Sequence, residues 1–253
     1  YDRYGNELGV ENTKVFIQNS DFEFIQTLRF TGENSYIKNS TFNNTGTINA
    51  GLDNLLFCNN SVSNSYLQNT LPWDVRIWGN EAIIEGNIFQ NGTGGFILHG
   101  NFTNITSNIF KDYYNRGGIS VLTFGNASSN STLSNNLFTN LTNIHALRLH
   151  TSDDNLIKNN TFMDAGVNWH TIMDRSGYRN HYLDNHFQDC NGKNESVVWY
   201  QTCIVFFYWS YPTDHYGGEH HLENNTFEGY KSAIRFNSYQ NNNTVIKKKY
   251  IRI

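Results

Sequence analysis

The sequence predicts an all-β fold in which one short unit is stacked many times. Asn-rich turns recur along the 253 residues, and each runs into an aromatic or aliphatic residue. The intervals between these end positions are 20, 20, 27, 21, 28, 24, 25 and 40 residues, a period typical of solenoid coils, and no stretch shows helical periodicity. The end positions are Phe22, Phe42, Val62, Phe89, Phe110, Phe138, Phe162, Phe187 and Phe227.

Each unit also contains two earlier strands, which predicts three strands per coil. An apolar triplet, often with Arg at its centre, lies about twelve residues before several end positions, and an aliphatic pair lies between them. These strands are three to five residues long and are divided by Gly, Asn, Ser or Asp. The triplets are Leu28–Phe30, Val75–Ile77, Phe96–Leu98 and Leu147–Leu149, with Ile172–Met173 as a shorter version; the pairs are Tyr36–Ile37, Ile83–Ile84, Leu156–Ile157 and Tyr182–Leu183.

Three such strands cannot bury an apolar face alone, so the coils must stack and enclose a column of side chains between three parallel sheets. The Phe end positions are expected to form one interior file. The turn asparagines are expected to adopt left-handed backbone geometry and to ladder their amides from coil to coil. Because parallel crossovers are almost always right-handed, the prediction is a right-handed parallel β-helix, a three-sheet solenoid of about nine or ten coils forming one domain over residues 1–253.

Over about residues 12–247 the sequence resembles the right-handed parallel β-helix superfamily. The resemblance is strongest to its branch with N-N-x-F turns, as at 159–162 and 224–227, which includes NosD-like proteins, polysaccharide lyases and adhesin-like surface proteins. It implies the fold. Since that fold also hosts hydrolases, epimerases and viral spikes, the function must be argued from a site.

Composition favours an extracellular or cell-surface protein. Charged residues make up 16% of the chain, aromatic residues 15%, and the net charge is −4. No basic stripe supports nucleic-acid binding, and no apolar run supports membrane insertion or a signal peptide. The chain opens on Tyr1 rather than Met, which favours a mature or excised product and leaves open that it is a piece of a longer polypeptide.

Asn-x-Ser/Thr sequons are frequent, and those in turns are expected to carry covalent glycans. Sequons that overlap the Asn ladder, at Asn39, Asn159 and Asn224, are expected to be buried. The glycosylation candidates are Asn43, Asn91, Asn101, Asn104, Asn126, Asn130, Asn140, Asn194 and Asn242.

Two of the three cysteines, Cys190 and Cys203, flank an insertion and could form a disulfide in an oxidising compartment; two unpaired thiols are the equal alternative. Cys58 has no evident partner. The insertion, around residues 191–218, is rich in aromatic residues, of which Tyr208, Trp209 and Tyr211 are candidates for carbohydrate binding or for contact with another subunit.

Strand alternation predicts a cationic outer face. It sends Leu147 and Leu149 inward and Arg148 and His150 outward. Arg binds carboxylate or sulfate, and Trp offers a platform for sugar rings, so this face suits an anionic or polyhydroxylated polymer. The alternative is an ordinary solvated face covered by long side chains. Applied to every coil, alternation gives one column of Arg29, Arg76, Ile97, Arg148 and Arg235 and a second of Thr31, Trp78, His99, His150 and Asp174.

Two function hypotheses remain open. The first is a glycosylated extracellular module with a structural, adhesive or filament-forming role, which self-associates through its end strands or its aromatic loop. The second is a carbohydrate-active enzyme, a uronate polysaccharide lyase or a glycoside hydrolase, that works on the Arg/His face.

The resemblance implies that a lyase would need a base together with Ca²⁺ or a cationic side chain. The candidates for that cluster are Arg148, His150, Asp174 and Arg175. A hydrolase would need paired acids, but the adjacent pair Asp153 and Asp154 is expected to cap a turn. No metal-ligand cluster is evident, and no cofactor is implied beyond calcium for a lyase.

Overall fold

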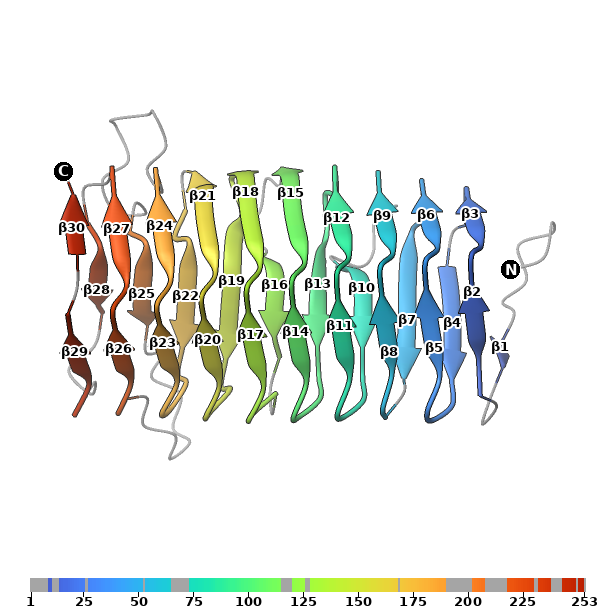
Figure 1. Cartoon of the computed structure of the whole chain (residues 1–253), viewed down its shortest axis with the longest axis horizontal. Helices are drawn as coiled ribbons and strands as arrows, with labels where there is room; N and C mark the ends of the chain where they lie inside the picture. Colours follow the sequence, from blue (N-terminus) through green and yellow to red (C-terminus); the bar gives the residue numbers. More distant parts are fainter. Residues whose placement is uncertain are drawn as a thin grey trace.

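Strands follow one another in a strict three-fold order along the chain, so that every third strand belongs to the same sheet. The computed structural model describes residues 9–10, 14–25, 27–51, 53–64, 73–114, 120–125, 128–167, 169–189, 202–207, 218–229, 232–237, 243–248 and 250–252, and within these ranges every regular element is a β-strand. Three parallel sheets of ten strands result, which we name A, B and C. In Figure 1 the coils lie side by side along the long axis, with sheets B and C nearest the viewer and sheet A behind.

The bounds of the strands are as follows. Sheet A consists of β1 (Gly9–Val10), β4 (Thr27–Thr31), β7 (Thr47–Gly51), β10 (Trp73–Ile77), β13 (Gly95–Leu98), β16 (Ser120–Phe124), β19 (His145–His150), β22 (Ile172–Arg175), β25 (Ile204–Phe207) and β28 (Ile234–Phe236). Sheet B consists of β2 (Phe16–Gln18), β5 (Tyr36–Lys38), β8 (Leu56–Cys58), β11 (Ile83–Glu85), β14 (Asn104–Thr106), β17 (Thr132–Ser134), β20 (Leu156–Lys158), β23 (His181–Leu183), β26 (His221–Glu223) and β29 (Val245–Lys247). Sheet C consists of β3 (Asp21–Glu23), β6 (Thr41–Asn43), β9 (Ser61–Ser63), β12 (Ile88–Gln90), β15 (Ile109–Tyr114), β18 (Leu137–Thr142), β21 (Thr161–Val167), β24 (His186–Gln188), β27 (Thr226–Glu228) and β30 (Tyr250–Arg252).

The interior contains the predicted file of Phe rings. From Phe89 to Phe227 the rings stack on successive sheet C strands with centroids 4.7 to 4.9 Å apart. Val62 interrupts the file one coil earlier, and Phe57 of sheet B bridges the interval between Phe42 and Phe89. Each fully buried Phe contributes about 2 to 3 kcal/mol of transfer free energy, so the file is a main source of stability.

A ladder of asparagine amides runs beside this file at the corner between sheets B and C. The Asn136 side chain donates hydrogen bonds to Asn160 Oδ1 and to the Ile105 carbonyl, both at 3.0 Å, and accepts one from the Asn108 amide. Each ladder side chain thus satisfies buried backbone groups of the preceding coil and, up to Asn185, is joined to the side chain of the following one. Its members are Asn60, Asn87, Asn108, Asn136, Asn160, Asn185 and Asn225.

The residue before each ladder position has left-handed backbone geometry, as at Asn159 with φ of +54°; Asn39, which precedes Ser40 at the same corner, likewise has φ of +53°. Asn reaches this region at lower cost than most residues. Both side chains point outward and are exposed, so the prediction that these two sequon asparagines are buried was wrong. Asn224 is half-buried. Where a turn has two asparagines, the first therefore adopts the left-handed conformation and the second forms side-chain hydrogen bonds inside the solenoid.

Candidate functional site

The outer face of sheet A carries the predicted arginine column. Strand register connects Arg76 to Ile97 and, on later coils, Arg148 to Met173 and Val205 to Arg235. Uncharged residues lie between the arginines, and of these only Ile97 was predicted, so the cations are two or three coils apart. In coil order the column is Arg29, Asn49, Arg76, Ile97, Thr123, Arg148, Met173, Val205 and Arg235.

The second predicted column is right at Trp78, His99 and His150, but wrong at Asp174. His150 pairs with Arg175, whereas Asp174 pairs with Leu149. Leu149 points inward, so Asp174 also points inward and is only 1% exposed. The prediction had aligned β22 one residue out of register, and a shift of one residue moves a side chain to the other face of a sheet.

Inside the solenoid Asp174 is held by a polar network. Its carboxylate accepts hydrogen bonds from the Tyr182 hydroxyl at 2.6 Å, the Asn180 amide at 3.0 Å and the Gly177 backbone N–H at 3.0 Å. His220 Nδ1 lies 3.7 Å from the same carboxylate. Burial lowers the pKa of His220 and raises the pKa of Tyr182 well above its usual value, so both are neutral at pH 7. This network is structural and lies away from the outer face.

Arg148, His150 and Arg175 form a compact cationic cluster on the outer face of β19 and β22. Burial and the neighbouring Arg175 lower the pKa of Arg148. Its Nε is buried with no hydrogen-bond partner, and among the residues that the structure describes Arg148 forms no salt bridge. Burial, reinforced by Arg148 and Arg175, lowers the pKa of His150 to about 4, so its imidazole is neutral at pH 7.

A second group lies on the same face three coils away. The rings of Trp78 and His99 stack with centroids 4.0 Å apart and an interplanar angle of 12°, and Trp78 is 49% exposed. Arg76 points to the same side of the sheet, and its Nε is likewise buried and without a partner in the described part of the chain. Burial, followed by the charge of Arg76, lowers the pKa of His99.

Two histidines that the sequence analysis passed over adjoin the cationic cluster. His145 and His170 are buried with ring centroids 5.8 Å apart, and His145 Nδ1 lies 2.8 Å from the His170 carbonyl oxygen. Burial lowers the pKa of His145 to about 4 and that of His170 to about 3, with further contributions from Arg148 and His145 respectively. No periodic signal identifies them, because they follow irregular turns rather than core strand positions.

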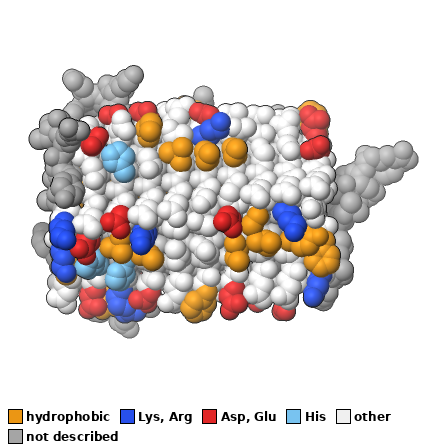
Figure 2. Space-filling view, viewed as in Figure 1, with side chains coloured by type: hydrophobic (Ala, Val, Ile, Leu, Met, Phe, Trp, Pro, Cys, Tyr) orange, Lys and Arg blue, Asp and Glu red, His pale blue; other side chains and the backbone are white. Residues whose placement is uncertain are grey.

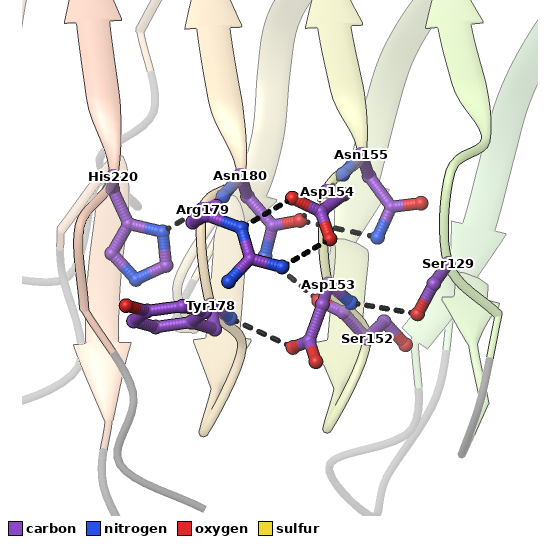
Figure 3. Close-up of polar contacts among 9 residues, drawn as sticks. All are labelled: Ser129, Ser152, Asp153, Asp154, Asn155, Tyr178, Arg179, Asn180 and His220. Carbon is purple, nitrogen blue, oxygen red and sulfur yellow. Dashed lines mark hydrogen bonds and ion pairs between the residues drawn. The ribbon is translucent and has the colours of Figure 1, made fainter.

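The corner that leads from sheet A to sheet B contains the acidic pair. Figure 3 shows Asp153 accepting the Tyr178 N–H, at 2.9 Å, and Asp154 held in a two-pronged contact by Arg179, at 2.6 Å for each bond. Burial raises the pKa of Asp153, whereas hydrogen bonding by Arg179 lowers that of Asp154. Each carboxylate supports the turn of the next coil, as expected for turn-capping residues.

A lyase of this fold would use either calcium or a cationic side chain, and the described residues of the sheet A face offer no ligand set for calcium. The one carboxylate predicted there, Asp174, faces the interior, and across the described ranges no three His, Cys, Asp or Glu side chains gather as metal ligands. Among the described residues, the groups on this face that are suited to binding an anion or a sugar are therefore arginine, neutral histidine and tryptophan side chains. Figure 2 shows the opposite side, sheets B and C, where most of the visible surface is uncharged and polar and charged side chains occur singly or in small groups.

Known proteins resemble this chain in structure. The catalytic domain of a GH87 α-1,3-glucanase in complex with tetrasaccharides aligns with a TM-score of 0.66 at 14% identity, over 96% of this chain and 53% of that one. The A-module of the Azotobacter vinelandii mannuronan C-5 epimerase AlgE6 gives 0.62 at 8% identity, over 92% and 74%. The periplasmic alginate epimerase AlgG gives 0.51 at 12% identity, over 96% and 76%. The chain has the right-handed parallel β-helix fold.

At these identities the likeness shows the fold alone, and this β-helix spans about half the length of the glucanase domain that it matches. No protein-family model and no curated protein matches the sequence. Within the described ranges the chain has no α-helix that is long and apolar enough to cross a membrane.

Sequon asparagines lie at the surface of the β-helix wherever the structure describes them. The side chains of Asn91, Asn104 and Asn130 are exposed, whereas Asn43 and Asn101 are half-buried and are hydrogen-bonded to neighbouring coils. Asn140 is exposed and donates to Asp112 at 2.6 Å. Asn126, Asn194 and Asn242 lie outside the described residues. Glycosylation itself stays a prediction.

The remaining predicted residues fall mostly outside the described ranges. Tyr208, Trp209 and Tyr211 of the aromatic insertion lie there, as does Cys190. Cys203 is buried next to β25. Because Cys190 lies outside the described residues, the disulfide between them stays a prediction. Cys58 is a buried free thiol, and burial is the main cause that raises its pKa.

Proposed function

We propose that this β-helix binds an acidic polysaccharide along the outer face of sheet A. The observation that carries the proposal is the Arg148 guanidinium, which lies beside Arg175 and His150 with a buried Nε that has no acceptor in the described part of the chain. An Nε–H of a charged guanidinium that is removed from water without an acceptor is costly. A carboxylate or sulfate on a ligand would supply that acceptor through charge-assisted hydrogen bonds.

A polymer fits this face better than a small anion does, because cations recur along it. Arg76, Arg148 and Arg235 are each three coils apart in one column. With strands about 4.8 Å apart, each interval is about 14 Å. The named substrates of two similar structures, mannuronan and alginate, are acidic polysaccharides, which supports this choice of ligand.

Elimination from a bound uronate is a second candidate, favoured by the neutral His150. In such a lyase the imidazole would take the proton α to the carboxylate, and Arg148 and Arg175 would neutralise that carboxylate. As the C4=C5 double bond forms, the C4–O bond would break, and the leaving oxygen would take a proton from the imidazolium or from water. Asp174 is excluded from this role by its burial. A hydrolase is less well supported, because Asp154 is already held by Arg179.

We also propose that the protein works outside the cell, with glycans on its surface sequons and an adhesive or structural role that can include contact between copies. The exposed asparagines at the corners and the periplasmic placement in the name of one similar protein support this proposal. Adhesion to an acidic cell-surface polymer would join the two hypotheses drawn from the sequence.

Binding to immobilised polymannuronate, polygalacturonate and neutral dextran tests the proposal. We expect retention by at least one acidic polymer, weaker retention at high salt, and at least a tenfold loss of affinity in Arg148→Ala. Lys111→Ala, on the outer face of sheet C, is the matched control. Equal retention by dextran, or equal effects of the two substitutions, would overturn it. An increase in ultraviolet absorbance during incubation, from an unsaturated product, would support the lyase activity as well.

A further inference from the structure

We infer that the open face of Trp78, above Gly51, is a stacking subsite for one pyranose ring of the same acidic polymer. The inference rests on the proposed function and adds a second, independent contact to it. Two features carry it: the stacked rings of Trp78 and His99, and the absence of a side chain at Gly51 on the neighbouring coil.

The pair is a fixed platform with one covered side. Trp78 follows β10 and His99 follows β13, and backbone hydrogen bonds from His99 N to Ile77 O and from Trp78 N to Ala50 O place them on adjacent coils. At 4.0 Å and 12°, the His99 ring covers one face of the indole. A Cβ added at Gly125 would lie 2.6 Å from the His99 ring, so this ring is packed against the coil beyond it.

The other face of the indole looks toward β7. Ile77 pairs with Ala50, so the next position along β7, opposite Trp78, is Gly51. Glycine has no side chain to cover the indole there, and Trp78 remains half exposed. A pyranose ring above Gly51 would place its C–H groups against an electron-rich aromatic face.

Polar groups suited to a uronate surround this position. Arg76 and Asn49 lie two residues before Trp78 and Gly51, so all four point to the same side of the sheet. The Arg76 Nε is buried without an acceptor, as at Arg148. Because burial and Arg76 lower the pKa of His99, its ring is neutral at pH 7 and adds no second cation to the stack. A sugar carboxylate would complete the hydrogen bonding of Arg76.

The two contacts are too far apart for one sugar. From β7 to β19 there are four strand spacings, about 19 Å. Only an oligosaccharide of several residues can reach both Trp78 and Arg148. Its affinity should therefore rise with length until both are engaged, as expected for linked binding sites.

Gly51→Val and Trp78→Ala test the subsite from opposite sides. Valine fills the space above β7, and it suits a strand position whose φ is not positive. Alanine removes the platform. Thr132→Val, on the outer face of sheet B, is the control for a surface β-branched residue. Matching urea unfolding midpoints would establish that the variants are folded.

The probes are oligomannuronates and oligogalacturonates from one to ten residues long, measured by calorimetry. We expect Gly51→Val and Trp78→Ala to bind the longest oligomers at least fivefold more weakly than the wild type does, and to bind the shortest oligomers equally well. Arg148→Ala should weaken the binding of long and short oligomers alike. If the longest oligomers bind both variants as they bind the wild type while Arg148→Ala weakens them, the subsite is wrong and the proposed function stands. If no oligomer binds, or Arg148→Ala has no effect, the proposed function is wrong as well.

Discussion

The Tyr182 hydroxyl donates a 2.6 Å hydrogen bond to the Asp174 carboxylate inside the solenoid, joining sheet B to sheet A across the core. A carboxylate in this position is tolerated because its oxygens also accept from Asn180 and Gly177. Strand alternation places the side chain of Asp174 inside the solenoid and that of the next residue, Arg175, on the cationic outer face. The hydrogen bonds give Asp174 a structural role that can be measured.

Asp174→Ala is expected to lower the free energy of unfolding by about 3 kcal/mol, because it leaves the Tyr182 hydroxyl and the Gly177 backbone N–H buried without an acceptor, while the Asn180 amide keeps only its bond to the Ser152 carbonyl. Urea denaturation measures the change. Tyr182→Phe removes only one donor and should cost less. Folded Asp174→Ala protein should bind the polysaccharide as the wild type does. A stably folded variant that no longer binds would show that Asp174 belongs to the binding site.

Asn136→Ala is expected to destabilise the protein by about 3 kcal/mol, because one substitution removes partners from both neighbouring coils. The adjacent Asn135 is the matched control, since it is exposed and has φ of +58°. Asn135→Gly should change stability by no more than about 0.5 kcal/mol, because glycine adopts this geometry readily. Equal losses would mean that the ladder contributes little.

Stability should fall as the pH is lowered from about 6.5 toward 4. The pKa of His145 is about 4 in the folded protein and near 6.5 in the unfolded chain, so in this window the unfolded state binds more protons. The contribution of His145 is complete above pH 6.5 and is lost on acidification, with a limiting slope of about 1.4 kcal/mol per pH unit. Urea titrations at several pH values test this, and His145→Gln should make the profile less steep, with the rest of the slope coming from other groups such as His150 and His170, whose pKa values are also lowered.

Secretion through a host with N-glycosylation machinery should yield glycopeptides at exposed corner sequons such as Asn159, identified by mass spectrometry. Asn39 and Asn59 lie at the same corner of adjacent coils, about 4.8 Å apart, so glycans on both should not occur in one molecule. Thr161→Ala, which removes a sequon but keeps Asn159, is the control. Secreted protein unmodified at every exposed sequon would contradict the prediction.

The repeat spacing was enough to predict the solenoid, the Phe file and the Asn ladder, because each depends on side chains that recur once per coil. The site was predicted less well. Arg148 and His150 were found through alternation alone, but Asp174 was assigned to the wrong face, since β22 is short and its register is set by pairing with Leu147 and Leu149. The burial of Asn39 and Asn159 was also misjudged, because consecutive residues of one turn have opposite orientations that composition does not distinguish.

The unequal spacing of the arginines limits what this surface can recognise. Arg29 and Arg76 are two coils apart, whereas Arg76, Arg148 and Arg235 are separated by three. A rigid chain with a charge on every sugar would therefore meet an arginine at only some of its residues. On the proposed function, the column therefore favours a polymer whose acidic groups can match intervals of two and of three coils at once, and coils inserted or deleted between two arginines would alter that preference without changing any contact residue.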